Sequence, residues 1–317
     1  MISARASAAH GAARAGVRRR AAIYLTRNWP LYVMIAPAMV VLALFHYYPM
    51  YGIVIAFQNF NPGLGFAGSP WVGLQNFQFL LNLPDFQQVF MNTLVIAVAK
   101  IVSIQVSAIT LALLLNEIRS NFFKRTVQTF VYLPHFLSWI VLGSILLDIL
   151  GAQGLVNQFL LTLGSKPILF LGSNQWFQPT LILSNLWKEA GWATIIYLAG
   201  LTGVDPSLYE AAAIDGANRW QQTWNVTLPG IVGLIILIAC LDLGNVLNAG
   251  FEQILTLYNP AVYASGDILD TYVYRAGLIS AQYSLAAAVG LVKSVLSFLM
   301  IVVAYWLAAR LSDYRIF

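Results

Sequence analysis

Six long apolar stretches limit what this chain can fold into. They lie at about 31–56, 88–115, 126–150, 180–203, 229–250 and 285–309, and each is long enough to cross ~30 Å of hydrocarbon as an α-helix. Charged residues make up only 9% of the 317 residues, whereas soluble domains carry about 25%. Too few charges remain to cover a globule of this size. We therefore expect an all-α integral membrane protein with six transmembrane helices.

Lys and Arg residues are divided unequally between the two sets of connections. One set contains the N-terminal arginines, Arg119, Lys124, Arg125, Arg219, Arg310 and Arg315, and the opposite set contains only Lys166 and Arg275. Because basic residues collect on the cytoplasmic side, we expect both termini and the connection before the fifth stretch to be cytoplasmic. The loops at 57–87, 151–179 and 251–284 would then be ordered caps on the outer side.

The first 28 residues contain no acidic residue and are rich in Arg, Ala and Ser. A signal peptide or a mitochondrial presequence fits this composition, but the apolar run that follows is too long for a signal peptide and has no clear cleavage site. The sequence favours a cytoplasmic tail over 1–28, followed by one transmembrane domain over 29–317.

The polar connection at 206–229, which we call the 206–229 loop, has the sequence features of two short helices joined by a turn. Pro206 suits the start of a helix over 207–214, Gly216 suits its end, and Asn218 can cap a second helix. Ala211, Ala212 and Ala213 form a small face, with Glu210, Asp215 and Arg219 at its rim. Two interpretations remain: a docking surface for another protein, or an amphipathic helix lying on lipid headgroups.

The same segment resembles the EAA loop of binding-protein-dependent ABC transporter permeases. Glu210, Ala211, Ala212, Gly216, Leu228 and Pro229 match that motif at its spacing, and Val226 replaces the motif's Ile. The stretches 112–120, 128–141, 186–201 and 271–278 resemble carbohydrate-importer permeases of the maltose type. Within them, the chain is most similar to the polysaccharide-permease branch, which handles pectin and alginate oligosaccharides.

This resemblance implies a type I ABC importer permease fold in a bacterial inner membrane. The 206–229 loop would be the coupling helix that sits in a cleft of a cytoplasmic ATPase subunit, with Asp215 and Arg219 among its coupling residues. The implied partners are a second permease, two ATPase subunits, an extracytoplasmic solute-binding protein and an oligosaccharide.

Several kinds of site are missing from the sequence. There is no phosphate-binding loop, since "LGSKP" at 163–167 lacks the required spacing, so ATP and Mg²⁺ would bind to the partner ATPase and no cofactor to this chain. Cys240 is the single cysteine, and His46 and His135 lie on different stretches without a second ligand at metal-binding spacing. We therefore expect no metal site and no catalytic residue.

Five ionisable residues lie inside the apolar stretches, where each is a functional candidate by default. They are Lys100, Lys188, Glu189, Asp242 and Lys293. Asn245, Asn248 and Glu252 follow Asp242 at spacings of three and four, which predicts a polar stripe along the fifth helix. Together with Trp187 and Trp192, whose rings could cover sugar faces, these residues form our predicted translocation pathway.

The charges in these stretches allow two interpretations. Asp242 could pair with Lys188 or Lys293 and hold the bundle together, or the charges could bond to sugar hydroxyls, and both can hold. Three lysines face two acidic residues, a surplus of one positive charge. This surplus predicts a preference for an acidic oligosaccharide, such as a uronate chain.

The sequence thus indicates a permease subunit of an ATP-driven importer that moves an oligosaccharide into the cytoplasm. An alternative is an intramembrane enzyme that processes lipid-linked sugars with Glu189 or Asp242 as catalytic carboxylates. A channel is a third interpretation, which the absence of a repeated pore motif disfavours.

Overall fold

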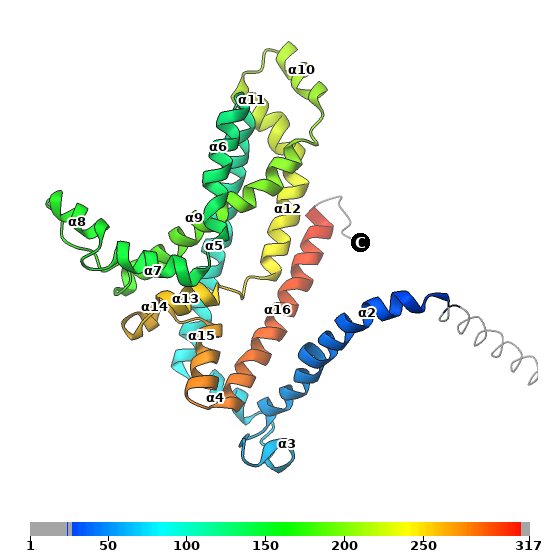
Figure 1. Ribbon diagram of the computed structural model, residues 1–317, viewed down its shortest axis with the longest axis vertical. Coiled ribbons are helices and arrows are strands. Elements are labelled where there is room, and N and C mark those ends of the chain that lie inside the picture. Colours follow the sequence, from blue (N-terminus) through cyan, green and yellow to red (C-terminus); the bar gives the residue numbers. More distant parts are fainter. Residues whose placement is uncertain (1–23, 25–26, 312–317) are drawn as a thin grey trace, which may run out of the picture. The chain divides into compact units, whose positions relative to one another are not determined.

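The structure, a computed structural model, describes residues 24 and 27–311, which form helices without a named strand. These residues divide into two compact units between Val54 and Ile55 (Figure 1). The first unit consists of α2 (Trp29–Leu42), a π-helical turn (Ala43–Tyr47) and the start of a 3-10 segment (Tyr48–Phe57). The predicted tail over 1–28 lies outside the described residues except for positions 24, 27 and 28.

Five segments of the described chain are long and apolar enough to cross a membrane: Trp29–Phe57, Pro84–Glu117, Trp139–Thr162, Arg219–Gly244 and Tyr283–Leu307. A sixth long helix, α9 (Asn174–Leu201), covers the fourth predicted stretch. It is more polar than the others because it carries Asn185, Lys188 and Glu189. At 28 residues it is still long enough to span ~30 Å of hydrocarbon.

The second unit is organised around α5 (Pro84–Glu117) and α9, which pack along one another (Figure 1). α12 (Leu228–Gly244) and α16 (Tyr283–Leu311) pack together as a second pair, and α12 also contacts α9. Near the end that carries the 206–229 loop, Ala108 and Ala112 of α5 pack against Tyr197 of α9 and Ile231 of α12. The small alanines let these helices approach closely.

Short helices occupy the connections at 57–87, 151–179 and 251–284, for which the sequence predicted ordered caps. They are α3 (Gly65–Gly68), α4 (Gln75–Leu81), α8 (Leu155–Thr162), α13 (Phe251–Leu257), α14 (Tyr263–Gly266) and α15 (Leu269–Tyr274), with a 3-10 turn at Pro260–Val262 and a π-helical turn at Arg275–Ile279. Arg275 pairs with the buried Asp267 at 2.5 Å and lies over the ring of Tyr263. Burial raises the pKa of Asp267 despite this pairing.

The third predicted crossing, a single helix over 126–150, is wrong. The chain forms α6 (Asn121–Tyr132), a 3-10 turn (Leu133–Phe136) and a separate α7 (Trp139–Leu150), with Leu137 extended between them. Pro134 lacks the N–H that a continuous helix needs, and the Ser138 hydroxyl caps the next helix by accepting from the Val141 N–H.

α6 is held against α9 at a position where α9 has no side chain. A Cβ on Gly191 would lie 2.1 Å from the carbonyl oxygen of Val131 in α6. The backbones of the two helices can therefore touch only because residue 191 is a glycine.

The fifth predicted helix also ends early, which removes the predicted continuous stripe from Asp242 to Glu252. α12 ends at Gly244, turns over 245–247 follow, and α13 begins at Phe251. Gly250 has φ +95°, a left-handed conformation that favours glycine. The absence of a side chain at Gly250 also leaves room for Lys100, because a Cβ at this position would lie 2.8 Å from Lys100 Nζ.

A buried network supports this break, which we call the 245–250 segment. The ammonium of Lys100, in a side chain only 6% exposed, donates to the Ala249 carbonyl at 2.6 Å and to Gln253 Oε1. Gln253 in turn donates to the carbonyl of Leu181 and to the Ser184 hydroxyl of α9. Irregular backbone at membrane depth needs such internal partners because hydrocarbon offers none.

Gly191→Ala is predicted to weaken the packing of α6 on α9. The added methyl group must push the Val131 carbonyl away, and overpacking of this kind costs about 1–3 kcal/mol. We expect a lower thermal unfolding temperature in detergent. Gly233→Ala, where nothing lies within 4 Å, is the matched control and should leave that temperature unchanged; an equal response of both variants would contradict the prediction.

Gln253→Leu is predicted to destabilise the 245–250 segment. It removes an acceptor from the buried Lys100 ammonium and the donor to Leu181 and Ser184, and each orphaned buried group costs about 1–3 kcal/mol. Thermal unfolding and proteolysis between α12 and α13 would measure the loss. Gln282→Leu, at an exposed position, is the control. Unaltered protease resistance of Gln253→Leu would show that the network does not support the segment.

Candidate functional site: a charged pocket and an exposed helical loop

A polar pocket lies where α5, α9 and the 245–250 segment meet. Its cavity measures about 280 Å³, and its polar lining comes from Lys100, Asn185, Glu189, Asp242, Asn245 and Asn248. We call it the Lys100 pocket. It gathers five of the ten predicted pathway residues from three separate parts of the chain. The early end of α12 contributes to this, because it lets Asn248 and Gly250 line the same cavity as Asp242.

The charges of the Lys100 pocket are held in different ways. Lys100 is bonded to neutral oxygens, and Asp242 has no ion-pair or hydrogen-bond partner among the described residues. Both oxygens of Glu189 are engaged, one by Lys188 at 2.9 Å and the other by His135 Nδ1 at 2.7 Å. Lys100 and Asp242 are therefore the two charges whose pairing capacity is left for a ligand.

The proposed pairing of Asp242 with Lys188 or Lys293 is absent from the described residues. Lys188 pairs with Glu189 and also donates to the His135 carbonyl at 2.8 Å. Lys293 pairs with Asp270 at 2.5 Å and donates to Asn248 Oδ1 at 2.9 Å. Asp270 is not among the predicted residues because it lies outside every apolar stretch, on α15, and only tertiary packing brings it to α16.

A second cavity of about 730 Å³ adjoins these residues. Its walls come from α13, α15, the Arg275–Ile279 turn and α16, and they include Asn248, Phe251, Asp270, Tyr274, Tyr283 and Lys293. We call it the Tyr274 pocket. Lys293 thus lies here rather than in the Lys100 pocket, and Asn248 lines both cavities.

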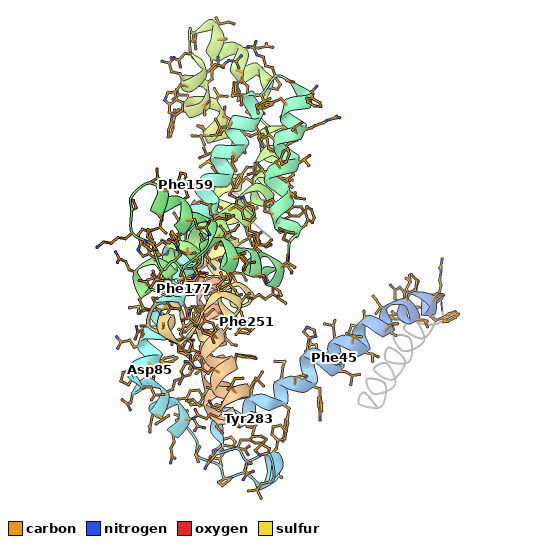
Figure 2. All side chains as sticks on the ribbon, turned by 60° about the vertical axis from the view of Figure 1, so that its left-hand side comes forward. Phe45, Asp85, Phe159, Phe177, Phe251 and Tyr283 are labelled. Atoms are coloured by element: carbon orange, nitrogen blue, oxygen red, sulfur yellow. The ribbon has the colours of Figure 1, made fainter. Side chains whose placement is uncertain are left out.

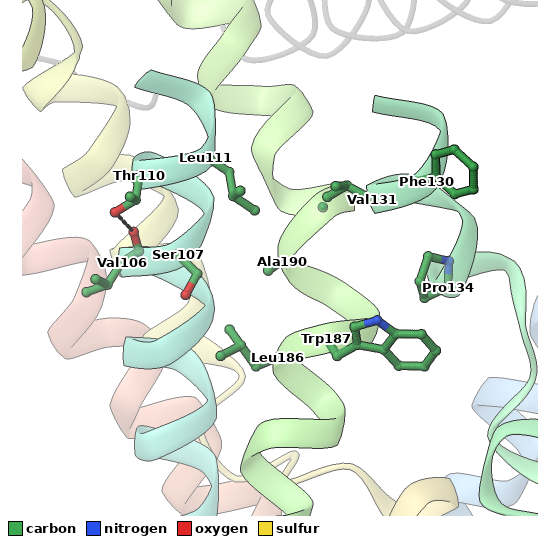
Figure 3. A pocket seen from close by; sticks show the side chains of 11 residues that line it. Val106, Ser107, Thr110, Leu111, Phe130, Val131, Pro134, Leu186, Trp187 and Ala190 are labelled. Carbon is green, nitrogen blue, oxygen red and sulfur yellow. Dashed lines mark hydrogen bonds between the residues drawn. The ribbon is translucent and has the colours of Figure 1, made fainter. Parts of the chain in front are cut away.

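The two predicted tryptophans lie away from the Lys100 pocket. Trp187 lines a third, mostly apolar cavity of about 460 Å³ between α5, α6 and α9, opposite Val106 and Leu111 and near Pro134 (Figure 3). Trp192 stacks on the ring of His135, with centroids 4.4 Å apart. Glu252 is exposed in the first turn of α13.

His135 was expected to be a structural histidine, and its contacts agree. Its ring lies between Trp192 and Glu189, and its carbonyl accepts from Lys188. It therefore ties the turn at Pro134 to α9. Among the described residues there is also no group of three or more His, Cys, Asp or Glu that could hold a metal ion.

The 206–229 loop has the local structure that the sequence predicted. α10 (Pro206–Ile214) begins with the Asp205 carboxylate accepting from the Ser207 N–H, a bond that lowers the pKa of Asp205. Gly216, at φ +78°, ends the helix. Asn218 and Gln221 then form a reciprocal cap for α11 (Arg219–Gln222), and a π-helical turn (Thr223–Thr227) leads into α12.

Most residues that match the EAA motif lie on the exposed side of this loop. Glu210, Ala211, Gly216 and Pro229 are exposed, whereas Ala212, Leu228 and Val226, which replaces the motif's Ile, are half-buried. The neighbouring Asp215 and Arg219 are exposed as well. Tyr209 bonds to Thr227 at 3.1 Å, and Arg219 lies 3.7 Å from Glu117 at the end of α5. The loop is thus braced against itself and joined to α5.

Large apolar side chains stand out on the same loop. Ile214 is 87% exposed and Trp220 69%, and Leu208 and Trp224 are also exposed. Such a set of exposed apolar residues marks a protein or membrane contact. Figure 1 shows α10 projecting beyond the ends of α5 and α6, with α11 level with those ends.

The chain is similar to known proteins over most of its length. Residues 105–313 match the family model described as binding-protein-dependent transport system inner membrane component. The polygalacturonan/rhamnogalacturonan transport system permease protein YteP of Bacillus subtilis (strain 168) is 43% identical over 301 residues, which cover 95% of this chain and 94% of that one.

Two solved structures share the fold. One is a crystal structure of a bacterial ABC transporter involved in the import of the acidic polysaccharide alginate, with TM-score 0.86, 36% identity and coverage of 93% of this chain and 100% of that one. The other is a bacterial alginate ABC transporter in complex with an alginate pentasaccharide-bound periplasmic protein, with TM-score 0.84, 35% identity and coverage of 92% and 98%. With its exposed EAA-type loop and its apolar helices, the chain belongs to the family of binding-protein-dependent transport system inner membrane components and is a multi-pass membrane permease.

Proposed function

We propose that this permease is one half of the transmembrane pathway of an ATP-driven importer for an oligosaccharide. The observation that carries the proposal is the agreement of fold over 93% of the chain, at 36% identity, with a transporter involved in alginate import. The Lys100 pocket supports it, because polar and charged groups from three parts of the chain line one cavity at membrane depth.

ATP and Mg²⁺ would bind to a separate ATPase subunit, since the sequence has no phosphate-binding loop. The 206–229 loop is the candidate contact with that subunit. Its exposed Ile214, Trp220 and Trp224 are suited to fill a hydrophobic cleft, and its caps keep it rigid. The lipid-surface interpretation accounts less well for Ala211 and Gly216, which leave room for another backbone.

Movement of the loop would reach the pocket along two routes. One runs through the π-helical turn into α12, which carries Asp242, and the other through the Arg219–Glu117 contact into α5, which carries Lys100. Displacing these helices would open the Lys100 pocket alternately to the two sides of the membrane. The exposed Arg219–Glu117 pair is the weaker route, because surface ion pairs contribute ~0–1 kcal/mol.

The distribution of Lys and Arg supports an orientation with both termini and the 206–229 loop in the cytoplasm of a bacterial cell. A solute-binding protein would then deliver the sugar to the side that carries α3, α4, α8 and α13 to α15. A second permease would complete the pathway, as membership of the binding-protein-dependent transport family implies. Two ATPase subunits would drive the pair.

An acidic substrate is supported by the relatives rather than by a surplus of charge. With Asp270 included, three lysines face three acidic residues, so the predicted excess disappears. Lys100 nevertheless has no carboxylate partner within the described chain, and a uronate carboxylate would supply one. We propose that Lys100 contacts the acidic group of the sugar.

The alternative of a sugar-processing enzyme gains no support from the pocket. Of its two candidate carboxylates, Glu189 already accepts from Lys188 and His135. Asp242 has no such partner among the described residues, but the family and the relatives that match this chain are transport permeases. Copurification distinguishes the two functions, because an importer brings an ATPase and a partner permease with it, whereas an enzyme turns over alone.

The complex purified in mild detergent and reconstituted with its binding protein should take up sugar only with ATP. We expect a uronate pentasaccharide to be transported at least about tenfold more efficiently than a neutral pentasaccharide, since a hydrogen bond to a charged group contributes ~1.5–3 kcal/mol. Faster uptake of the neutral sugar would contradict the acidic preference, and uptake without ATP would contradict the importer.

Gly216→Pro is predicted to uncouple ATP hydrolysis from uptake. Proline cannot adopt the left-handed conformation of residue 216. The substitution would therefore change the orientation of α10 and leave the membrane helices intact. We expect uptake to fall about tenfold or more with membrane insertion unchanged, an estimate based on a strained backbone costing ~1–3 kcal/mol. Gly216→Asn, which tolerates this conformation, is the control; normal uptake by Gly216→Pro would exclude a coupling role.

A further inference from the structure

The Tyr274 pocket has a lining suited to a sugar ring. The rings of Phe251 and Tyr274 lie 5.8 Å apart and are tilted by 59°, and Tyr283 lines the same cavity. In Figure 2, Phe251 lies near the middle of the molecule and Tyr283 lies lower, farther from the 206–229 loop. Aromatic faces cover the C–H face of a sugar, and a few placed polar groups then fix its orientation.

The polar groups of this pocket are only partly used. Lys293 has three N–H donors, and two are directed to Asp270 and Asn248. Among the described residues, Asp270 Oδ2 and Asn248 Nδ2 have no partner. The cavity therefore offers a free ammonium donor, a free carboxylate acceptor and a free amide donor within one cluster, which matches the alternating donors and acceptors of sugar hydroxyls.

The two cavities are neighbours. Asn248 lines both of them, and the consecutive residues Gly250 and Phe251 line the Lys100 pocket and the Tyr274 pocket respectively. The 245–250 segment is therefore the wall between them. A single linear molecule could contact both cavities by passing this wall.

We propose that the Tyr274 pocket is a second saccharide subsite, so that successive units of one oligosaccharide contact the Lys100 pocket and the Tyr274 pocket together. This inference rests on the proposed function. Tyr274 and Phe251 cover a ring face, and Asp270, Lys293 and Asn248 bond its hydroxyls. The opposite charges of Asp270 and Lys293 compensate one another, so this subsite binds neutral and acidic sugar units alike. Lys100 alone binds the carboxylate of the sugar. The chain consequently selects oligosaccharides over monosaccharides.

Cysteine protection in the assembled transporter tests the subsite. In a Cys240→Ser background, Ala287→Cys places a thiol in the wall of the Tyr274 pocket, and Ala152→Cys places one at an exposed site. A membrane-impermeant maleimide is applied with galacturonate or trigalacturonate. We expect trigalacturonate to protect Ala287→Cys at a concentration about two- to tenfold below that of galacturonate, the ratio expected from one added aromatic contact. Ala152→Cys should be labelled equally throughout.

Removing the ring tests the role of Tyr274 itself. Tyr274→Ala should abolish the advantage of trigalacturonate in the protection assay, and Tyr274→Phe should keep it, because the ring face and not the hydroxyl is required. Subunit composition should be unchanged in both variants, which shows that each complex still assembles.

Five results would overturn the subsite. Equal protection by monomer and trimer, or none by either, in a complex that transports trigalacturonate would place the pocket off the pathway while leaving the proposed function intact. Ala287→Cys that is unlabelled without sugar, or loss of the partner permease in Tyr274→Ala, would identify the pocket as a subunit contact. A complex that transports no sugar would remove the proposed function and the subsite together.

Discussion

A buried ammonium without a carboxylate partner determines much of this architecture. Lys100 lies inside the helical bundle and is satisfied by the Ala249 carbonyl and by Gln253. An isolated charge in such surroundings is costly, so the main chain must present a carbonyl to it. A carbonyl within a regular helix is already bonded along the helix, whereas one in the 245–250 segment is available. The early end of α12 and the burial of Lys100 therefore depend on one another.

This arrangement is also what creates the two cavities. Asn248 lines both cavities, and Gly250 lines the Lys100 pocket. The break exposes amides and main-chain groups at membrane depth, which is tolerated only where they line a cavity or are buried in protein. Gly250 allows the sharp change of direction, and Phe251 immediately begins the wall of the next cavity.

Most of the charges near these cavities are paired within the chain, which the residue types alone do not reveal. Lys188 and Lys293 lie inside apolar stretches and looked available, but both are occupied, the first by its neighbour Glu189 and the second by Asp270. His135 adds a second partner to Glu189 and joins the turn at Pro134 to α9. Lys100 and Asp242 are therefore the main candidates for contact with a ligand, because their charges remain uncompensated within the described chain.

The sequence by itself determined the class of protein, the positions of most of the long helices and the local structure of the 206–229 loop, because these follow from apolar length, from capping residues and from Gly216. It did not predict the interruption at Pro134, since a proline inside an apolar stretch can either bend a helix or end it, and the choice depends on the contacts of α6 and His135 with α9. Only the tertiary structure decided that α12 stops at Gly244, that Asp270 meets Lys293 and that Trp187 lies away from Asp242. These are contacts between residues distant in the chain, and periodicity along one helix carries no information about which side chain another helix brings to it.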